Sequence, residues 1–173
     1  MQEIPGEGVA VADRVFHPGI GALLLVPGPD GLRVWTPEHP PAGSRYGAPV
    51  EANILLEHGD DLDQVDLALV AEVLGRVDHY LTLGLGFVRG ALEDDPGFFG
   101  LTAAELGRYR GPGPADVPLE EPQLNFYVDA WHLRFAEGRL PICDPYGLAV
   151  VFDGHRPVRI EDLSEAADVD AES

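Results

Sequence analysis

The chain has 173 residues, 45% of them hydrophobic, and carries 30 acidic against 11 basic residues, for a formal net charge of −19. Every basic residue is an arginine, and the absence of lysine excludes Schiff-base chemistry and a phosphate-binding P-loop, since both need a lysine side chain. A negative charge of this size repels nucleic acid and anionic membranes, so we expect neither as a partner. It is compatible with a basic protein partner.

The length suits one α+β domain over residues 1–173, and no apolar run approaches the roughly 18 residues that would span a bilayer. The acidic, proline-broken N-terminus lacks the pattern of a signal peptide. The single cysteine cannot form an internal disulfide and fits a reducing compartment. We therefore expect a cytoplasmic protein that is a monomer or a homodimer.

The N-terminal third contains apolar runs separated by Pro- and Gly-rich turns, a pattern that predicts strands. Residues 1–8 precede them and are expected to form a loose arm. The second and third runs are joined by a five-residue loop and predict a β-hairpin. The strands are expected over residues 9–16, 22–26, 32–36 and 48–57.

Between residues 60 and 92 hydrophobic residues recur at helical spacing, which predicts a long amphipathic helix. Gly84, Gly86 and Gly90 each weaken a helix by about 1 kcal/mol relative to alanine, so a break or bend is expected near Gly84. These glycines superficially match a dinucleotide fingerprint, but no second parallel strand with an acidic ribose ligand follows. Contact between helix and sheet, or a bend, explains them better, and no cofactor is expected.

A second, shorter helix is predicted over residues 102–110. Thr102 and Glu105 form a capping box at its start, and a Gly-Pro pair ends it. The following residues, 113–121, are interpreted as a linker. The acidic C-terminal tail, residues 164–173, lacks aromatic residues and is expected to be disordered.

The C-terminal part is predicted to form adjacent antiparallel strands, because three chain reversals follow one another at short spacing. Gly138, the Asp-Pro-Tyr-Gly sequence at 144–147 and the Asp153-Gly154 pair supply these turns. In the first strand the apolar alternation slips by one residue, which predicts a β-bulge near residues 129–131. The strands are expected at residues 123–136, 140–143, 148–152 and 158–160.

Strands at both ends of the chain, with helices between them, predict an α+β fold. Its largely antiparallel sheet combines the N-terminal hairpin with the C-terminal meander. The long helix, with its expected break, and the short helix pack on one face of this sheet.

One catalytic hypothesis involves Cys143, His132 and Asp144. With a two-residue loop after Ala136, the strand register would place His132 opposite Cys143, whereas a three-residue loop would place Trp131 there. An imidazole beside a thiol generates a thiolate nucleophile, and a carboxylate can orient the ring. The alternative is a buried cysteine that behaves as a small hydrophobe, which is the commoner role.

A binding surface is the second hypothesis, because aromatic and arginine side chains are enriched at protein interfaces. Packing between helix and sheet is the ordinary alternative for its two phenylalanines. The scattered histidines and the aspartate spacing near residue 60 match neither a zinc nor a calcium site, so no metal is expected. The candidate binding residues are Phe98, Phe99, Arg108, Tyr109, Arg110 and Tyr127.

The sequence does not specify the function. The acidic charge and the aromatic and arginine residues favour a domain that binds a basic protein partner non-covalently, for example as an inhibitor or immunity-type protein. The alternative is a small hydrolase or transferase that uses Cys143 with His132.

Overall fold

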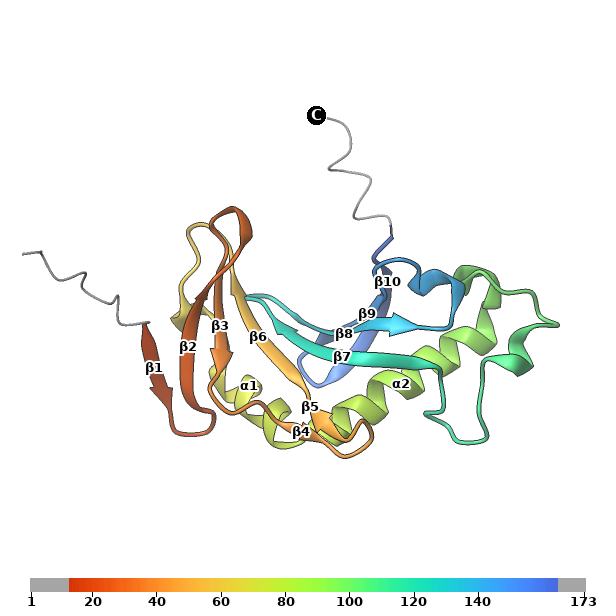
Figure 1. Cartoon of the computed structure of the whole chain (residues 1–173), viewed down its shortest axis with the longest axis horizontal. Helices are drawn as coiled ribbons and strands as arrows, with labels where there is room; N and C mark the ends of the chain where they lie inside the picture. The colour runs from red at the N-terminus through yellow and green to blue at the C-terminus, as the bar shows by residue number, and fades with distance from the viewer. Residues whose placement is uncertain (1–12, 165–173) are drawn as a thin grey trace, which may run out of the picture.

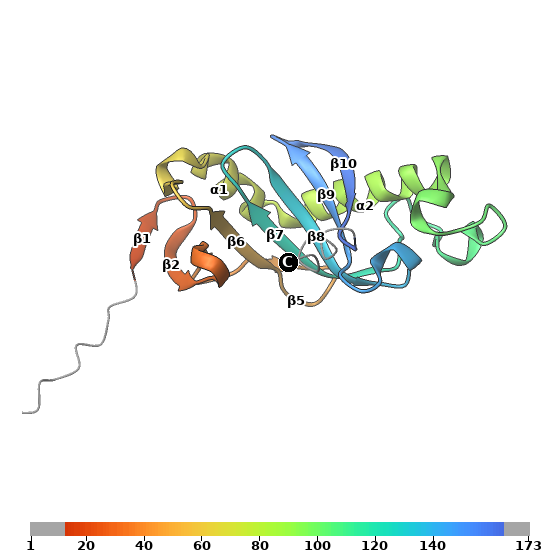
Figure 2. The same ribbon diagram turned by 90° about the horizontal axis from the view of Figure 1, so that it is seen from above.

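A computed structural model of the chain describes residues 13–164. Eight strands form one sheet, and two α-helices lie along one of its faces (Figures 1 and 2). The strands of this sheet, in spatial order, are β1 (Arg14–His17), β2 (Gly21–Pro27), β3 (Arg33–Pro37), β6 (Glu51–Leu56), β7 (Leu119–Phe126), β8 (Trp131–Gly138), β9 (Leu148–Asp153) and β10 (Arg156–Asp162). The remaining elements are the two-stranded sheet of β4 (Ala42–Gly43) and β5 (Ala48–Pro49), the α-helices α1 (Leu67–Gly75) and α2 (Val77–Asp94), and the 3-10 helices η1 (Pro29–Gly31), η2 (Leu62–Gln64), η3 (Pro96–Phe99), η4 (Leu106–Arg108) and η5 (Pro141–Cys143).

The expected N-terminal arm, residues 1–8, lies outside the described residues, as does the acidic tail beyond Ser164. Only the end of the strand expected at 9–16 is described, and it forms β1, which pairs with β2. The hairpin expected in this region is confirmed, with Val26 of β2 opposite Val34 of β3.

Neighbouring strands of the large sheet are antiparallel except for β6 and β7, which run parallel. A parallel pair needs a crossover connection, and α1 and α2 lie in the chain between these two strands. The predicted α+β fold is confirmed, with a largely antiparallel sheet and helices packed on one face. Neither helix of the described chain combines the length and the hydropathy that a bilayer crossing requires.

The break in the helical region lies at Arg76, whose backbone leaves the helical region (φ −132°, ψ 38°), and not near Gly84. The expected position of the break is therefore wrong, and α2 runs continuously through its glycines. Gly84 instead faces the sheet at very close range, since an added β-carbon would lie 2.5 Å from Leu133 Cδ2. The interpretation of this glycine as a helix-to-sheet contact is confirmed.

An aromatic cluster joins α2 to the centre of the sheet. Phe126, Trp131 and Phe152 form one cross-strand row on β7, β8 and β9, and their rings stack at centroid distances of 5.5 and 4.0 Å. Tyr80 of α2 meets Trp131 edge-on at 5.5 Å. Each of these side chains is at most 2% exposed. Full burial of such a side chain contributes about 1.5–3 kcal/mol, so this row is a major part of the core.

The single strand expected over residues 123–136 is wrong, because this segment contains the hairpin of β7 and β8. The chain reverses at residues 127–130, where the Tyr127 N–H donates to the Ala130 carbonyl at 2.9 Å. The slip in apolar alternation therefore marks a turn, and the expected β-bulge near 129–131 is also wrong. Each strand keeps its own alternation on either side of the reversal.

The strand expected at residues 140–143 is likewise wrong, since Pro141 starts the 3-10 helix η5. No reversal occurs at Gly138, where β8 ends, and β8 pairs with β9 instead. The turn expected at 144–147 is present, and the Gly147 N–H donates to the Cys143 carbonyl at 2.7 Å. The hairpin of β9 and β10 is confirmed.

Only half of the capping box expected near residue 102 forms: Glu105 Oε2 accepts from the Thr102 N–H at 2.8 Å and from its hydroxyl at 2.9 Å, but the Glu105 N–H donates to the Thr102 carbonyl at 3.1 Å and not to the hydroxyl. The two hydrogen bonds that Glu105 accepts lower its pKa. The α-helix expected over 102–110 is wrong, because only a 3-10 turn, η4, follows the box. The short helix of the fold is α1. The segment interpreted as a linker, 113–121, already enters β7 at Leu119.

Candidate functional site

The face of the large sheet opposite α1 and α2, called the open face below, presents two polar rows across β6, β7 and β8. Side chains alternate between the two faces of a strand. Residues in register therefore share a face, and these rows alternate with core residues such as Trp131. The first row consists of Asn53, Asn125 and His132, and the second of Glu51, Gln123 and Arg134.

Hydrogen bonds link the members of these rows. Asn53 Nδ2 donates to Asn125 Oδ1 at 3.3 Å and to Glu51 Oε1 at 2.9 Å. Arg134 Nη1 donates to Gln123 Oε1 at 3.2 Å, and its Nη2 donates to the Tyr146 carbonyl at 3.0 Å. The middle of the open face is therefore an ordered polar surface.

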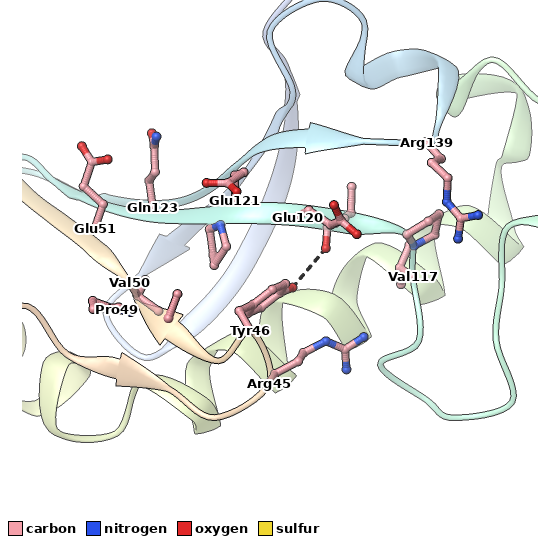
Figure 3. Close-up of a pocket in the computed structure, with 14 residues that line it drawn as sticks. Arg45, Tyr46, Pro49, Val50, Glu51, Val117, Glu120, Glu121, Gln123 and Arg139 are labelled. Atoms are coloured by element: carbon pink, nitrogen blue, oxygen red, sulfur yellow. Dashed lines mark hydrogen bonds between the residues drawn. The ribbon is translucent and has the colours of Figure 1, made fainter.

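A groove of about 630 Å³ lies beside the first residues of β7, at the edge of the sheet, where Glu51, Glu121 and Gln123 point toward the open face and Arg45 and Tyr46 lie on the other side of the strand (Figure 3). Arg45 and Tyr46 line it from the loop between β4 and β5, and Arg139 lines it from the segment after β8. Tyr46 Oη donates to the Leu119 carbonyl at 3.2 Å and so ties this loop to β7 (Figure 3). Burial raises the pKa of Tyr46, although Arg45 opposes the shift, so the hydroxyl keeps its proton at neutral pH.

The backbone of β7 is unusual where it borders the groove. Glu121 adopts a left-handed conformation (φ 54°), which costs a non-glycine residue about 1–3 kcal/mol. As a result Leu119 and Pro122 both point inward and are buried, and Glu120 and Glu121 between them are both exposed. Such strain is concentrated at functional sites in proteins. Here it gives the groove two consecutive exposed carboxylates.

A second hollow of about 400 Å³, the side hollow, shares Pro118, Glu120 and Arg139 with the groove. The two together are bordered by five carboxylates from separate segments of the chain. Seven arginines form ion pairs within residues 13–164, and none of these pairs involves a carboxylate of this set. The five are Glu51, Glu120, Glu121, Glu137 and Asp144.

A third cavity of about 200 Å³, the turn pocket, lies at the other end of β7, beside the β7–β8 turn. Its lining includes Tyr127, His132 and three carboxylates. Six residues of β7 and its turn separate Glu121 from Tyr127, which corresponds to about 20 Å of extended chain. The groove and the turn pocket therefore mark the two ends of one polar track.

The expected pairing of Cys143 with His132 is wrong. His132 faces Val151 of β9. Cys143 lies at the far end of β8, where a β-carbon added to Gly138 would be 2.8 Å from the Cys143 Sγ. Six residues along β8 separate that point from His132, or about 20 Å. Asp144 borders the side hollow together with Cys143.

The environment of Cys143 is that of a buried thiol. Its side chain is 4% exposed, and burial, reinforced by the negative charge of Asp162, raises its pKa to about 11. A thiol with such a pKa is almost entirely protonated at neutral pH and is a poor nucleophile.

The six aromatic and arginine candidates do not form one surface. Phe98, Phe99, Arg108, Tyr109 and Arg110 follow the end of α2, whereas the β7–β8 turn that carries Tyr127 lies well away from this segment, on the side of the molecule toward β1–β3 (Figures 1 and 2). Within the first group, Phe99 is fully buried and Phe98 packs edge-on against it at 5.2 Å. Arg110 pairs with Glu93 at 3.2 Å. Only Tyr127 lies at a cavity of the open face.

The groove residues were not identified from the sequence. Residues 119–121 look like the end of a linker, and nothing in the sequence links Tyr46 to Leu119, 73 positions away. In residues 13–164, no three side chains of His, Cys, Asp or Glu are grouped so that they could hold a metal ion.

Comparison with known proteins adds no functional assignment. No protein-family model, curated protein or solved structure matches the chain. The case for a function therefore depends on the open face and on the cavities at its two ends.

Proposed function

We propose that the protein binds a basic polypeptide segment non-covalently along the open face. The observation that carries this proposal is the set of five groove and side-hollow carboxylates without an arginine partner in the described chain. Charge-assisted hydrogen bonds from arginine or lysine side chains of a partner would satisfy these carboxylates. A partner of this chemistry also suits a chain of net charge −19.

The length of the track favours a polypeptide over a small cation. About 20 Å separates the groove from the turn pocket, which an extended segment of roughly six residues spans. Between them lie Asn53, Asn125 and Gln123, whose amides can hydrogen-bond a partner's backbone. An inhibitor or immunity-type protein that covers a basic target is one form of this function.

A hydrolase or transferase that depends on Cys143 and His132 is the weaker reading. His132 lies near the start of β8, whereas Cys143, in η5, packs beside the other end of that strand and its thiol is buried. A nucleophile and its base must lie within hydrogen-bonding reach of each other, at about 2.6–3.2 Å. Non-covalent binding needs no such pair.

The test is titration of the protein into a fluorescein-labelled nona-arginine peptide, followed by fluorescence anisotropy at about 0.05 and 0.3 M salt. We expect the double substitution Glu51→Gln and Glu121→Gln to weaken binding by about tenfold, because two charge-assisted contacts are lost. The matched control is Asp63→Asn with Asp94→Asn, which changes the net charge equally. Both control carboxylates are exposed and take part in no described ion pair or side-chain hydrogen bond.

The control should change the dissociation constant by less than about twofold, since it leaves the groove intact. Equal weakening by both double variants would show that the peptide responds to net charge alone. That outcome, or no binding at the lower salt concentration, would overturn the proposal.

A further inference from the structure

The turn pocket has the size of one side chain. Its volume of about 200 Å³ corresponds to roughly seven water molecules at about 30 Å³ each. Pockets for drug-sized ligands start at about 300 Å³, so a nucleotide or another large cofactor does not fit. Residues from the end of β6, the following loop and the β7–β8 hairpin line it, among them Leu55, Glu57, Asp60, Tyr127, Asp129 and His132.

Two aromatic rings form one wall of this pocket. The ring centroids of Tyr127 and His132 lie 4.8 Å apart with a tilt of 51°. Both side chains are half-buried, and neither the Tyr127 hydroxyl nor a His132 ring nitrogen has a hydrogen-bond partner in the part of the chain that the structure describes. The negative face of such a ring attracts a cation within about 6 Å of its centroid.

The charged side chains that line the pocket, apart from His132, are all carboxylates, although Arg33 binds the Asp60 carbonyl, and Arg134 and Arg159 lie near enough to act on the two rings. Glu57, Asp60 and Asp129 line the pocket, no arginine lines it, and none of the three carboxylates belongs to an ion pair of the described chain. A cation that enters the pocket therefore meets several acceptors and displaces no existing arginine. The aromatic wall and the carboxylates favour the same kind of ligand.

The protonation states of the two rings suit this ligand. Burial lowers the pKa of His132, with Glu161 opposing and Arg159 assisting the shift. Burial raises the pKa of Tyr127, assisted by Glu161 and opposed by Arg134. At neutral pH the imidazole is therefore uncharged and does not repel a cation, and the phenol keeps its proton.

We propose that the turn pocket receives the guanidinium group of an arginine side chain in the polypeptide segment bound on the open face. This inference rests on the proposed function and names the anchor of the bound segment. A planar guanidinium stacks on aromatic rings and donates to carboxylates in a fork, whereas an ammonium group is a compact, strongly hydrated point charge. The aromatic rings and the separate carboxylates suit the guanidinium.

The test uses N-acetyl-arginine amide as the probe and N-acetyl-citrulline amide as its uncharged counterpart of the same shape. Carbon-edited NMR of the histidine rings follows binding, and a His132→Gln spectrum assigns the His132 signals. We expect saturable shifts of these signals with the arginine probe and none with the citrulline probe. Tyr127→Leu, which removes the ring, should weaken binding about tenfold, whereas Tyr127→Phe keeps the ring and should retain it.

A second pair of variants tests whether binding of the arginine probe requires a carboxylate of the turn pocket. Asp129→Asn should weaken binding of the arginine probe several-fold, and Asp94→Asn, with the same loss of charge at the end of α2, should not. Equal shifts with citrulline, equal affinity for N-acetyl-lysine amide, or no shift at His132 would each overturn the guanidinium assignment.

These outcomes separate the anchor from the proposed function. If nona-arginine binding depends on Glu51 and Glu121 while the arginine probe leaves His132 unchanged, the groove function stands and the anchor fails. If the probe binds beside His132 but nona-arginine is insensitive to the groove substitutions, the proposed function fails.

Discussion

Gly84 of α2 and Leu133 of β8 lie in close contact between helix and sheet, since a β-carbon on residue 84 would lie 2.5 Å from Leu133 Cδ2. Both residues are buried, and Leu133 is 0% exposed. The absence of a side chain at position 84 thus sets how near the helix lies to the sheet. Glycine is retained here in spite of its low helix propensity.

Replacement of Gly84 by alanine should therefore destabilise the protein. Overpacking in a core lowers the free energy of unfolding by about 1–3 kcal/mol, whereas the higher helix propensity of alanine raises it by only about 1 kcal/mol. We expect a net loss of about 1 kcal/mol in the free energy of unfolding, measured by urea denaturation.

Gly90→Ala is the matched control, because Gly90 lies in the same helix, is exposed, and has no atom within 4 Å of an added β-carbon. This substitution should stabilise the protein by up to about 1 kcal/mol. Equal effects of the two substitutions would show that helix propensity alone, and not the contact with Leu133, sets the cost at residue 84.

Turn chemistry and periodicity made much of the fold predictable from the sequence. The Pro- and Gly-rich loop after β2 and the Asp153-Gly154 pair mark both confirmed hairpins, because these residue types favour tight turns. The apolar stripe between residues 60 and 92 marks the helical region. These patterns involve residues close together in the sequence, so they can be recognised without knowledge of the tertiary structure.

The β7–β8 hairpin could not be predicted in this way, because the turn at residues 127–130 contains neither Gly nor Pro. Its only trace is the slip in apolar alternation, which a bulge explains equally well. Interpreting the slip as a bulge merged β7 and β8 into one expected strand. It also gave that strand residues 140–143 as its neighbour, whereas β8 pairs with β9. The expected pairing of His132 with Cys143 depended on that register and is wrong for the same reason.

The groove could not be predicted from the sequence for a different reason. The left-handed backbone of Glu121 places Leu119 and Pro122 on the same side of β7, which breaks the alternation that identifies a strand. Its opposite wall, including Tyr46, comes from a distant loop. A site built from strained backbone and long-range contacts leaves little periodic signal in a sequence.

Cys143 should react slowly with iodoacetamide in the native protein. Burial raises its pKa to about 11 from an ordinary value of 9.0, so the thiolate fraction near pH 8 falls about 100-fold. We expect alkylation of the native protein to be at least about 100-fold slower than alkylation in urea, followed by mass spectrometry. Rapid alkylation of the native protein near neutral pH would contradict this prediction and would favour the hydrolase or transferase reading.

His132 should make the protein less stable in mild acid. Burial lowers its pKa, so below the ordinary value of about 6.5 the folded protein binds fewer protons than the unfolded chain. The free energy of unfolding then falls as the pH decreases through this range, by at most about 1.4 kcal/mol per pH unit for one proton.

Urea denaturation at about pH 7.5 and about pH 5.5, on either side of the ordinary histidine value, measures this effect. His132→Gln should reduce the difference between the two conditions. His58→Gln, at an exposed position in the loop after β6, provides the control and should leave the difference unchanged. A pH dependence that persists in His132→Gln would assign it to other groups.

Tyr80 and His155 should be energetically coupled, because their side chains connect α2 to the β9–β10 turn. Tyr80 Oη lies 2.8 Å from His155 Nδ1 and donates to Glu72 Oε1 at 3.4 Å. His155 Nε2 lies 3.7 Å from the other oxygen of Glu72. Tyr80→Phe removes the hydroxyl but keeps the ring against Trp131, and should cost about 0.5–1.5 kcal/mol.

A double-mutant cycle with Tyr80→Phe and His155→Gln separates this contact from the packing of the ring. If the hydrogen bond joins the two elements, the second substitution should cost less once the first has been made, with a coupling energy of at least about 0.5 kcal/mol. The pair Tyr80→Phe and His39→Gln should be additive, because His39 is exposed in the loop after β3 and makes no described contact with Tyr80. Additivity in both cycles would mean that the β9–β10 turn is held by the sheet alone and that Tyr80 contributes only through its ring.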